Sequence, residues 1–150
     1  GAEKQIRKYL IDNNFIDCII QLPDNLFYGT TIATCIMVLK KSKRDNHTLF
    51  LDASKQCVKI TNSNKLTEDN IQTILTAYLD RADKPHFAAL VPNDKIAEQD
   101  YTLSVSTYVE QEDTREVIDI QKLNAEIAQI VAREQKLREE IDKIVAEIEG

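Results

Sequence analysis

The sequence predicts an α/β fold followed by one long amphipathic helix. Three observations support this prediction. Two apolar runs rich in β-branched residues, 15–22 and 32–39, have the composition of strands buried on both faces. Residues 67–80 repeat apolar side chains at helical spacing. The last segment, from about 117 to 149, changes to a heptad pattern that is typical of a coiled coil.

The first third of the chain supplies its elements in a simple order. We expect a short helix over residues 2–12, which the Asn13-Asn14 pair ends. The two apolar strands follow, with a loop between them. A third strand is expected at 48–53, and residues 54–65 are expected to be irregular.

The helix expected at 67–80 begins with favourable end residues. Thr67 is a good N-cap, and Leu66 can pack against Ile71 as a hydrophobic staple. Its apolar positions, at i, i+3, i+4, i+7 and i+8, predict one buried face. They are Ile71, Ile74, Leu75, Tyr78 and Leu79. A short apolar run, Phe87–Val91, comes next and ends at Pro92. In residues 101–109 apolar and polar side chains alternate weakly.

The final helix carries an apolar stripe with alternating steps of three and four residues. The stripe consists of Ile120, Leu123, Ile127, Ile130, Leu137, Ile141, Ile144 and Ile148, with Glu134 at its one polar position. At 1.5 Å per residue the helix would be on the order of 48 Å long. This length favours a partner helix from another chain. The alternative is an antiparallel return onto the helix at 67–80.

Composition and charge narrow the class of protein. The apolar fraction of 43% is that of a globular chain, and no apolar run could span a bilayer. Residues 1–109 carry 13 acidic and 13 basic side chains, whereas 110–150 carry 12 and 6. The one basic cluster, Lys40 to Arg44, is interpreted as a solvated strand end. If the chain acts on nucleic acid, a partner or a missing segment would supply most of the basic residues that bind it.

The cysteines and glycines argue against a complete active site. Cys18 and Cys35 lie in apolar runs and Cys57 stands alone, without metal-ligand spacing, so we expect buried thiols in a cytoplasmic protein. Only three glycines occur, so no glycine-rich nucleotide loop can form. The sequence therefore predicts no catalytic, cofactor-binding or metal-binding residues in this chain.

The loop between the first two strands is unusual because it is apolar. Leu26, Phe27 and Tyr28 stand together just before Gly29. Loops are normally polar and carry function disproportionately often. We expect the rest of the fold or a ligand to cover these rings.

Several segments, in their order and spacing, resemble the late part of the methylation subunit of type I restriction–modification systems. The matching segments are Ile6–Leu10, Ile19–Pro23, Asn25–Phe27, Ile32–Leu39, Leu49–Ser54 and Asp100–Val109. Members of this family are adenine-N6 DNA methyltransferases that use S-adenosylmethionine. The cofactor glycine motif and the Asn-Pro-Pro-aromatic motif of such enzymes are missing here. The resemblance therefore implies a C-terminal fragment that is inactive alone and binds no cofactor.

The resemblance also implies an organisation. Residues 1–54 would be the tail of a class I methyltransferase fold, in which the last two strands form an antiparallel hairpin. Residues 55–109 would be a helical and irregular extension. Residues 110–150 would be the helix that docks the specificity subunit and, through it, the restriction subunit.

The same resemblance assigns the apolar loop to the pocket for an adenine extruded from double-stranded DNA. Phe27 is the best candidate to pack on the base, with Tyr28 second and Asn25 beside them. The alternative is that Phe27 only plugs the edge of the domain. A competing interpretation of the whole chain is a self-contained α/β module that dimerises through its coiled coil and has no role with DNA. Self-association of the isolated chain is compatible with either.

Overall fold

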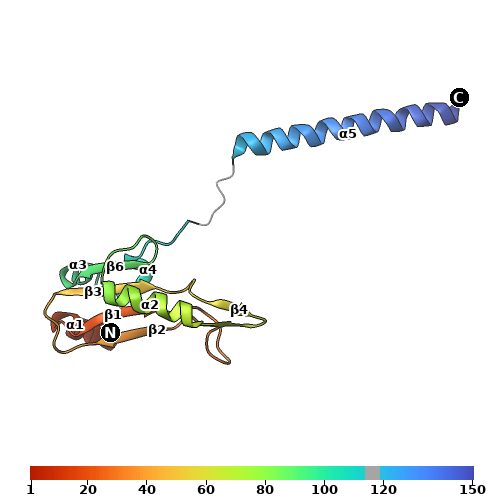
Figure 1. Ribbon diagram of the computed structural model, residues 1–150. Helices are drawn as coiled ribbons and strands as arrows, with labels where there is room; N and C mark the ends of the chain where they lie inside the picture. Colours follow the sequence, from red (N-terminus) through yellow and green to blue (C-terminus); the bar gives the residue numbers. More distant parts are fainter. Residues whose placement is uncertain (114–118) are drawn as a thin grey trace. The chain divides into compact units, whose positions relative to one another are not determined.

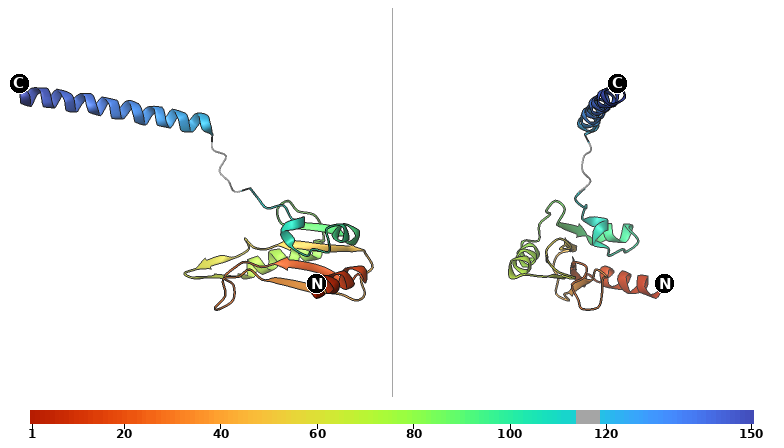
Figure 2. Two further views of the ribbon diagram at one scale, coloured as in Figure 1. Left: turned by 180° about the vertical axis from the view of Figure 1, so that it is seen from behind. Right: turned by 90° about the vertical axis from the view of Figure 1, so that its right-hand side faces the viewer.

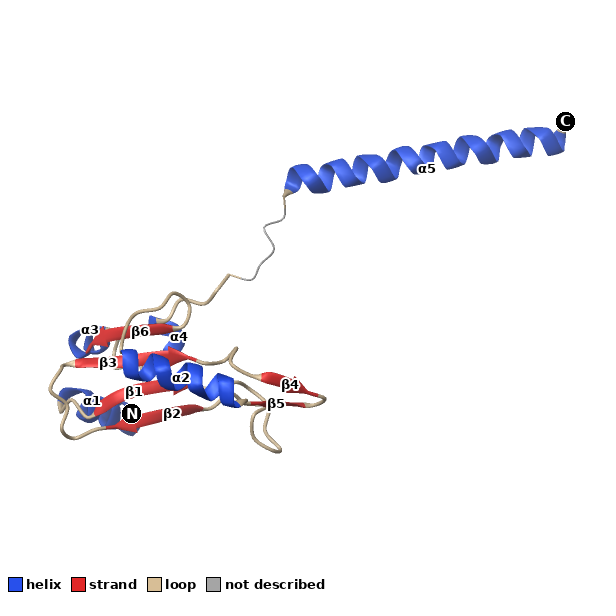
Figure 3. Ribbon diagram, viewed as in Figure 1, coloured by secondary structure: helices blue, strands red, loops and turns tan. Residues whose placement is uncertain are grey.

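The computed structural model describes residues 1–113 and 119–150, and it divides the chain into two units, Gly1–Glu112 and Asp113–Gly150. The first unit is built on a four-stranded sheet with the strand order β2-β1-β3-β6 (Figure 3). Its strands are β1 (Ile16–Gln21), β2 (Cys35–Leu39), β3 (His47–Asp52) and β6 (Ala88–Pro92). The predicted α/β class is confirmed.

The centre of the sheet is a parallel pair. β1 runs parallel to β3, with Cys18 opposite Leu49 and Gln21 opposite Asp52. β2 and β6 are antiparallel to their neighbours and form the two outer strands of this sheet. β1 and β3 are buried almost throughout, as their continuous apolar sequences predict.

Helices cover both faces of this sheet (Figures 1 and 2). They are α1 (Ala2–Asp12), α2 (Glu68–Asp80), α3 (Asn93–Glu98) and α4 (Val105–Tyr108). On one face Ile19 and Phe50 join a core with Ile96 and Val105, from α3 and α4. On the other face Cys18, Leu49 and Leu51 pack with Ala77 of α2. The result is three layers, with α1, α3 and α4 opposite α2.

The helix predicted at 2–12 is confirmed as α1, which buries Ile11 and leaves Ile6 and Tyr9 each 60% exposed. Two other predictions about the first 65 residues are wrong in part. β2 was expected to be buried on both faces from residue 32, but it begins at Cys35 and its side chains are mostly exposed, because no described strand lies on its outer side. The stretch 54–65 is not irregular: β4 (Val58–Ile60) and β5 (Ser63–Lys65) form a hairpin.

The cysteine prediction holds for one residue. Cys18 is buried, and this burial raises the pKa of its thiol to about 12. Cys35 is exposed and Cys57 is half-buried, so the expectation of three buried thiols is wrong. Cys35 is exposed for the same reason as the rest of β2.

α2 begins as predicted, but its apolar face is only partly covered. Thr67 accepts a hydrogen bond from the backbone of Asn70 and Asn70 bonds back, which completes a capping box. Ile71 and Leu79 remain 52% and 68% exposed. A groove of about 350 Å³ runs between α2 and the β1–β2 pair. Its walls are apolar, from Ile20, Leu22, Ile36, Val38, Leu66, Ile71, Ile74, Leu75 and Tyr78.

Buried polar groups tie the layers together. Asp17 in β1 accepts hydrogen bonds from the Tyr78 hydroxyl at 2.6 Å and the Arg81 guanidinium at 2.9 Å. Both donors belong to α2 or its C-cap, so a charged contact anchors this helix to the sheet. On the other face the neutral side chain of Asn93 anchors α3 to the sheet. Its amide donates to Asn14 and Asn46, and its carbonyl oxygen accepts from Thr48 of β3.

The described residues of the second unit contain one helix, α5 (Ile120–Glu149), whose 30 residues are all exposed. Asp119 caps its first turn by accepting from the backbone of Gln121 and Lys122. The predicted start at about 117 lies outside the described residues. The helix is confirmed, whereas its pairing with another helix stays a prediction. No helix in the described part of the chain is both long and apolar enough to cross a membrane.

Arg81→Ala tests the anchor between α2 and the sheet. The side chain of Asp17 is 3% exposed, so removal of the guanidinium leaves a buried carboxylate with only the Tyr78 hydroxyl. We expect unfolding free energy to fall by about 2–3 kcal/mol. Urea unfolding followed by tyrosine fluorescence measures this, because all five tyrosines lie in the first unit.

Lys84→Ala is the matched control, because Lys84 makes an exposed ion pair with Asp80 at 3.4 Å. Such pairs contribute about 0.5 kcal/mol or less. Equal losses for the two variants would show that the Asp17 contact is no more than a surface ion pair.

Candidate functional site

The carboxyl ends of β1 and β3 meet at one edge of the sheet. The strands are parallel, so Gln21 and Asp52 end opposite each other, and the backbone of Ala53 donates to Gln21. The segments that leave this edge are the apolar loop 22–34 and the stretch 53–66. In α/β folds the crevice outside the carboxyl ends of parallel strands is the usual place for a ligand.

The loop 22–34 is closed at its base and shaped by two left-handed residues. Leu22 donates its backbone N–H to Thr34 at 2.8 Å, which brings the two ends of the loop together. Asn25 has a φ of 48° and Gly29 a φ of 76°. No atom outside Gly29 and its chain neighbours would meet a Cβ there, so the backbone angle and not crowding is what favours glycine.

The three apolar residues of the loop have different environments. Leu26 packs against the core on the α2 side of the sheet. Phe27 is 52% exposed, and Tyr28 is fully exposed. The sequence predicted that something covers these rings, and within the described chain nothing covers Tyr28. The described residues therefore cover only part of the Phe27 ring, and its role stays a prediction.

The β4–β5 hairpin supports this loop. Asn64 donates its backbone N–H to the carbonyl of Asn25 at 2.8 Å. Its side-chain amide donates to the carbonyl and carboxylate of Asp24, at 2.8 and 2.9 Å. Together the loop and the hairpin enclose a polar hollow of about 430 Å³. Its lining comprises Asp24, Asn25, Lys59, Thr61, Asn62, Ser63 and Asn64.

Sequence reasoning missed the hairpin as part of the site. The available signal was the short alternation of Val58, Lys59 and Ile60, followed by the polar residues Thr61 and Asn62. Thr61 has a φ of 37°, which is unusual for a β-branched residue, and no Asn-Gly pair marks the turn.

Asp52 is the buried acid of this edge. Its carboxylate accepts hydrogen bonds from the backbone of Ser54 and the side-chain amide of Gln111. Burial raises the pKa of Asp52, but these hydrogen bonds and the charge of Lys55 outweigh it and hold that pKa below its ordinary value. The carboxylate therefore stays ionised and links the turn after β3 to the segment after α4.

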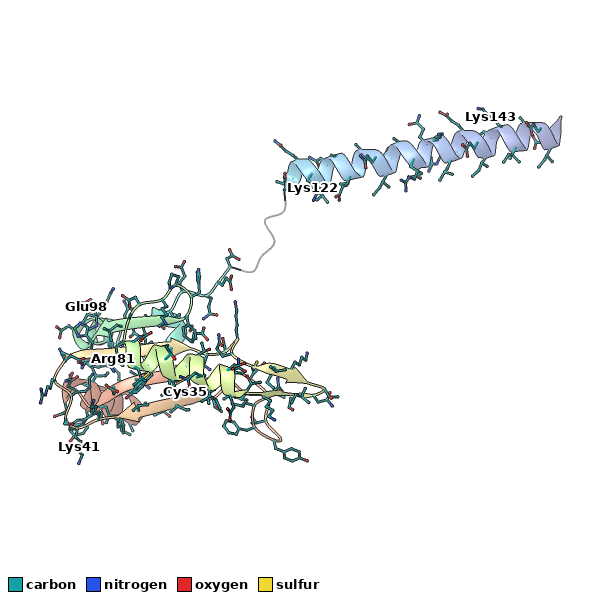
Figure 4. The ribbon with its side chains drawn as sticks, viewed as in Figure 1. Cys35, Lys41, Arg81, Glu98, Lys122 and Lys143 are labelled. Atoms are coloured by element: carbon teal, nitrogen blue, oxygen red, sulfur yellow. The ribbon has the colours of Figure 1, made fainter. Side chains whose placement is uncertain are left out.

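The basic cluster at 40–44 is not part of this edge. The prediction that it is solvated holds for Lys40, Lys41 and Arg44 but is wrong for Lys43. Lys40 donates its backbone N–H to Phe15, which precedes β1, so the cluster lies at the amino end of that strand. Figure 4 shows Lys41 at the end of the sheet opposite the β4–β5 hairpin. The side chain of Lys43 is buried: it is 2% exposed, and its ammonium group donates to the carbonyls of Ile16 and His47.

At this edge the described residues form a partly exposed apolar loop and a polar hollow. Of the predicted residues, Asn25, Phe27 and Tyr28 lie in one loop at the carboxyl edge. The predicted docking residues, from Ile120 to Ile148, all lie in α5 in the other unit. Among residues 1–113 and 119–150, no group of three or more His, Cys, Asp and Glu side chains is placed to hold a metal ion.

Comparison with known proteins gives consistent matches. The sequence profile of a family described as N-6 DNA Methylase matches residues 1–117. The chain is 42% identical over 149 residues to the type I restriction enzyme MpnII methylase subunit of Mycoplasma pneumoniae. It is 35% identical over 156 residues to the MjaVII methylase subunit of Methanocaldococcus jannaschii. These alignments cover 99% and 100% of this chain but only 27% and 26% of those proteins.

Solved structures agree with this result. A methyltransferase subunit of a type I restriction-modification system from Streptococcus thermophilus superposes with a TM-score of 0.73 at 40% identity, over 75% of this chain and 24% of that one. A chain from a study of type I system assembly and conformational transition matches with a TM-score of 0.58 at 13% identity, over 97% of this chain and 32% of that one. The second match shows the fold alone. The chain thus spans about a quarter of the curated relatives that it matches.

Proposed function

Because the chain belongs to the N-6 DNA methylase family, we propose that it is the C-terminal part of the methylation subunit of a type I restriction–modification system. The parent would be an adenine-N6 DNA methyltransferase that uses S-adenosylmethionine and works in the cytoplasm, where the DNA lies. The observation that carries this proposal is the alignment of nearly the whole chain with a quarter of a methylase subunit at 42% identity.

Surfaces of the first unit support a place within a larger domain. β2 exposes apolar side chains such as Ile36, Met37 and Leu39, and no described strand pairs with its outer edge. The adjoining groove beside α2 is apolar. Both features are expected if further strands and helices of the parent continue the sheet beyond β2. In that arrangement β1 and β2 are the last, antiparallel pair of the methyltransferase sheet.

We expect no site for S-adenosylmethionine among the described residues. The chain has only three glycines, Gly1, Gly29 and Gly150, and none stands between a strand and the N-terminus of a helix. The cofactor would be bound by the remainder of the subunit. We therefore assign no step of methyl transfer to this chain and expect it to be inactive alone.

The loop 22–34 is proposed as one wall of the pocket for the target base. An enzyme that acts on a base within a duplex extrudes it and needs a surface on which the base stacks. Phe27 provides an exposed ring on a loop that Leu26 and Asn64 hold in place. Tyr28 stands beside it as the second candidate, and Asn25 links the loop to the hairpin.

α5 is proposed as the contact with the specificity subunit, through which the restriction subunit would join. Its apolar stripe is exposed along the whole helix, with Ile130 at 65% and Ile141 at 58%. Glu134 interrupts the stripe and pairs with Arg138 at 2.9 Å. A single polar residue at such a position favours one register of helix pairing. Pairing of two copies of this chain is the competing arrangement.

Phe27→Ala tests the base pocket in the complete subunit, assembled with its specificity subunit. Loss of a stacking ring weakens base binding by about 1–3 kcal/mol. We expect a tenfold or greater drop in the methylation rate and weaker binding of a duplex whose target adenine is mispaired. Tyr9→Ala is the control, because Tyr9 is a similarly exposed aromatic on α1. Unchanged methylation and unchanged binding of the mispaired duplex would refute the role of Phe27.

The double variant Ile130→Asp, Ile141→Asp tests docking through α5. Two carboxylates on the stripe should abolish co-purification with the specificity subunit, since charge is costly in a helix–helix core. Ala132→Asp with Ala146→Asp adds the same charge on the opposite face of the helix and should leave the complex intact. An intact complex with the first variant contradicts docking through this stripe.

A further inference from the structure

The two faces of the β4–β5 hairpin are not equivalent. Directly paired residues of an antiparallel ladder lie on the same face. Lys59 pairs with Asn64, and Val58 pairs with Lys65. The side-chain amide of Asn64 donates to Asp24, so the face that carries this side chain is the one turned toward the loop 22–34. Lys59 therefore lies on the loop side of the hairpin, and it lines the polar hollow there.

The segment that forms the hairpin is the most uniformly basic part of the carboxyl edge. Between Asp52 and Glu68 the chain has three lysines and no acidic residue. Lys55 is used in an ion pair with Glu112 at 2.9 Å. Lys59 and Lys65 are both exposed, and neither forms an ion pair with another described residue. Asp24, an acid that lines the hollow, already accepts the Asn64 amide.

The turn of the hairpin adds neutral hydrogen-bonding groups. Thr61, Asn62 and Ser63 are exposed at its tip and line the same hollow as Lys59. Hydroxyls, amides and lysines are the groups that commonly contact phosphate oxygens. Figure 1 shows the hairpin extending beyond the sheet at the same end as the loop 22–34.

We infer that the β4–β5 hairpin binds the DNA phosphate backbone beside the extruded adenine, with Lys59 as its charged contact. This inference rests on the proposed function and adds a role that the loop alone does not supply. A base is extruded by rotation about its backbone, so a contact on the neighbouring phosphates holds the strand while the base is out. The Asn64 hydrogen bonds couple this contact to the loop that carries Phe27.

The experiment compares Lys59→Gln with Lys65→Gln in the complete subunit assembled with its specificity subunit. Both changes remove one charge from an exposed lysine of the same hairpin, but only Lys59 lies on the loop side. Binding to a fluorescent duplex with the recognition site is measured by anisotropy over a range of KCl concentrations. The slope of log affinity against log salt is negative, and one lost phosphate contact reduces its magnitude by about 0.9.

We expect Lys59→Gln to weaken binding roughly three- to tenfold at about 0.1 M salt and to reduce the slope by that amount. Lys65→Gln should keep the wild-type affinity and slope, and Lys59→Arg should keep the slope. Wild-type affinity and slope in Lys59→Gln would overturn the inference, and so would an equal loss in Lys65→Gln. Failure of the wild-type complex to methylate DNA would instead refute the proposed function.

Discussion

The parallel pairing of β1 with β3 is the constraint on which the rest of the first unit depends. It places Gln21 and Asp52 at the same edge of the sheet, so the loop after β1 and the hairpin after β3 leave from adjacent points. Antiparallel strands would have sent these two segments to opposite ends. Three hydrogen bonds from Asn64 then hold the hairpin against the loop, and the half-exposed ring of Phe27 is presented from a supported backbone.

Burial of this pair on both faces requires that its polar atoms find partners inside the protein. Asp17 meets this requirement through Tyr78 and Arg81, and the same contacts fix α2 on the sheet. On the other face Asn93 links the end of α1, the turn before β3 and β3 itself. These contacts hold the helices on the sheet in one arrangement. None of them involves the loop 22–34 or the β4–β5 hairpin at the carboxyl edge.

The parts of the fold that the sequence could predict are those with strong, self-contained signals. Continuous apolar runs mark β1 and β3, and the threonine cap with helical spacing marks α2. The apolar run at β2 looks the same in sequence, yet its side chains are mostly exposed. An apolar run indicates that a strand can be buried, but it does not tell which strands or helices lie beside it. The hairpin was missed because its strands have three residues each and its turn lacks a typical turn pair. The loop could be singled out because it is apolar, whereas the choice of Phe27 within it came from the family resemblance. The exposure of the Phe27 ring could not be predicted, because it depends on how Leu26 and Asn64 anchor that loop.

A photo-crosslinking measurement tests most directly whether the carboxyl edge carries the base pocket. 5-Iodouracil replaces the target adenine in a duplex bound by the complete subunit with its specificity subunit. After irradiation, the modified peptide is identified by mass spectrometry. The account predicts that the crosslink lies in the loop 22–34, on Phe27 or Tyr28. Crosslinks confined to other segments, in a complex that methylates the unmodified duplex, would contradict it.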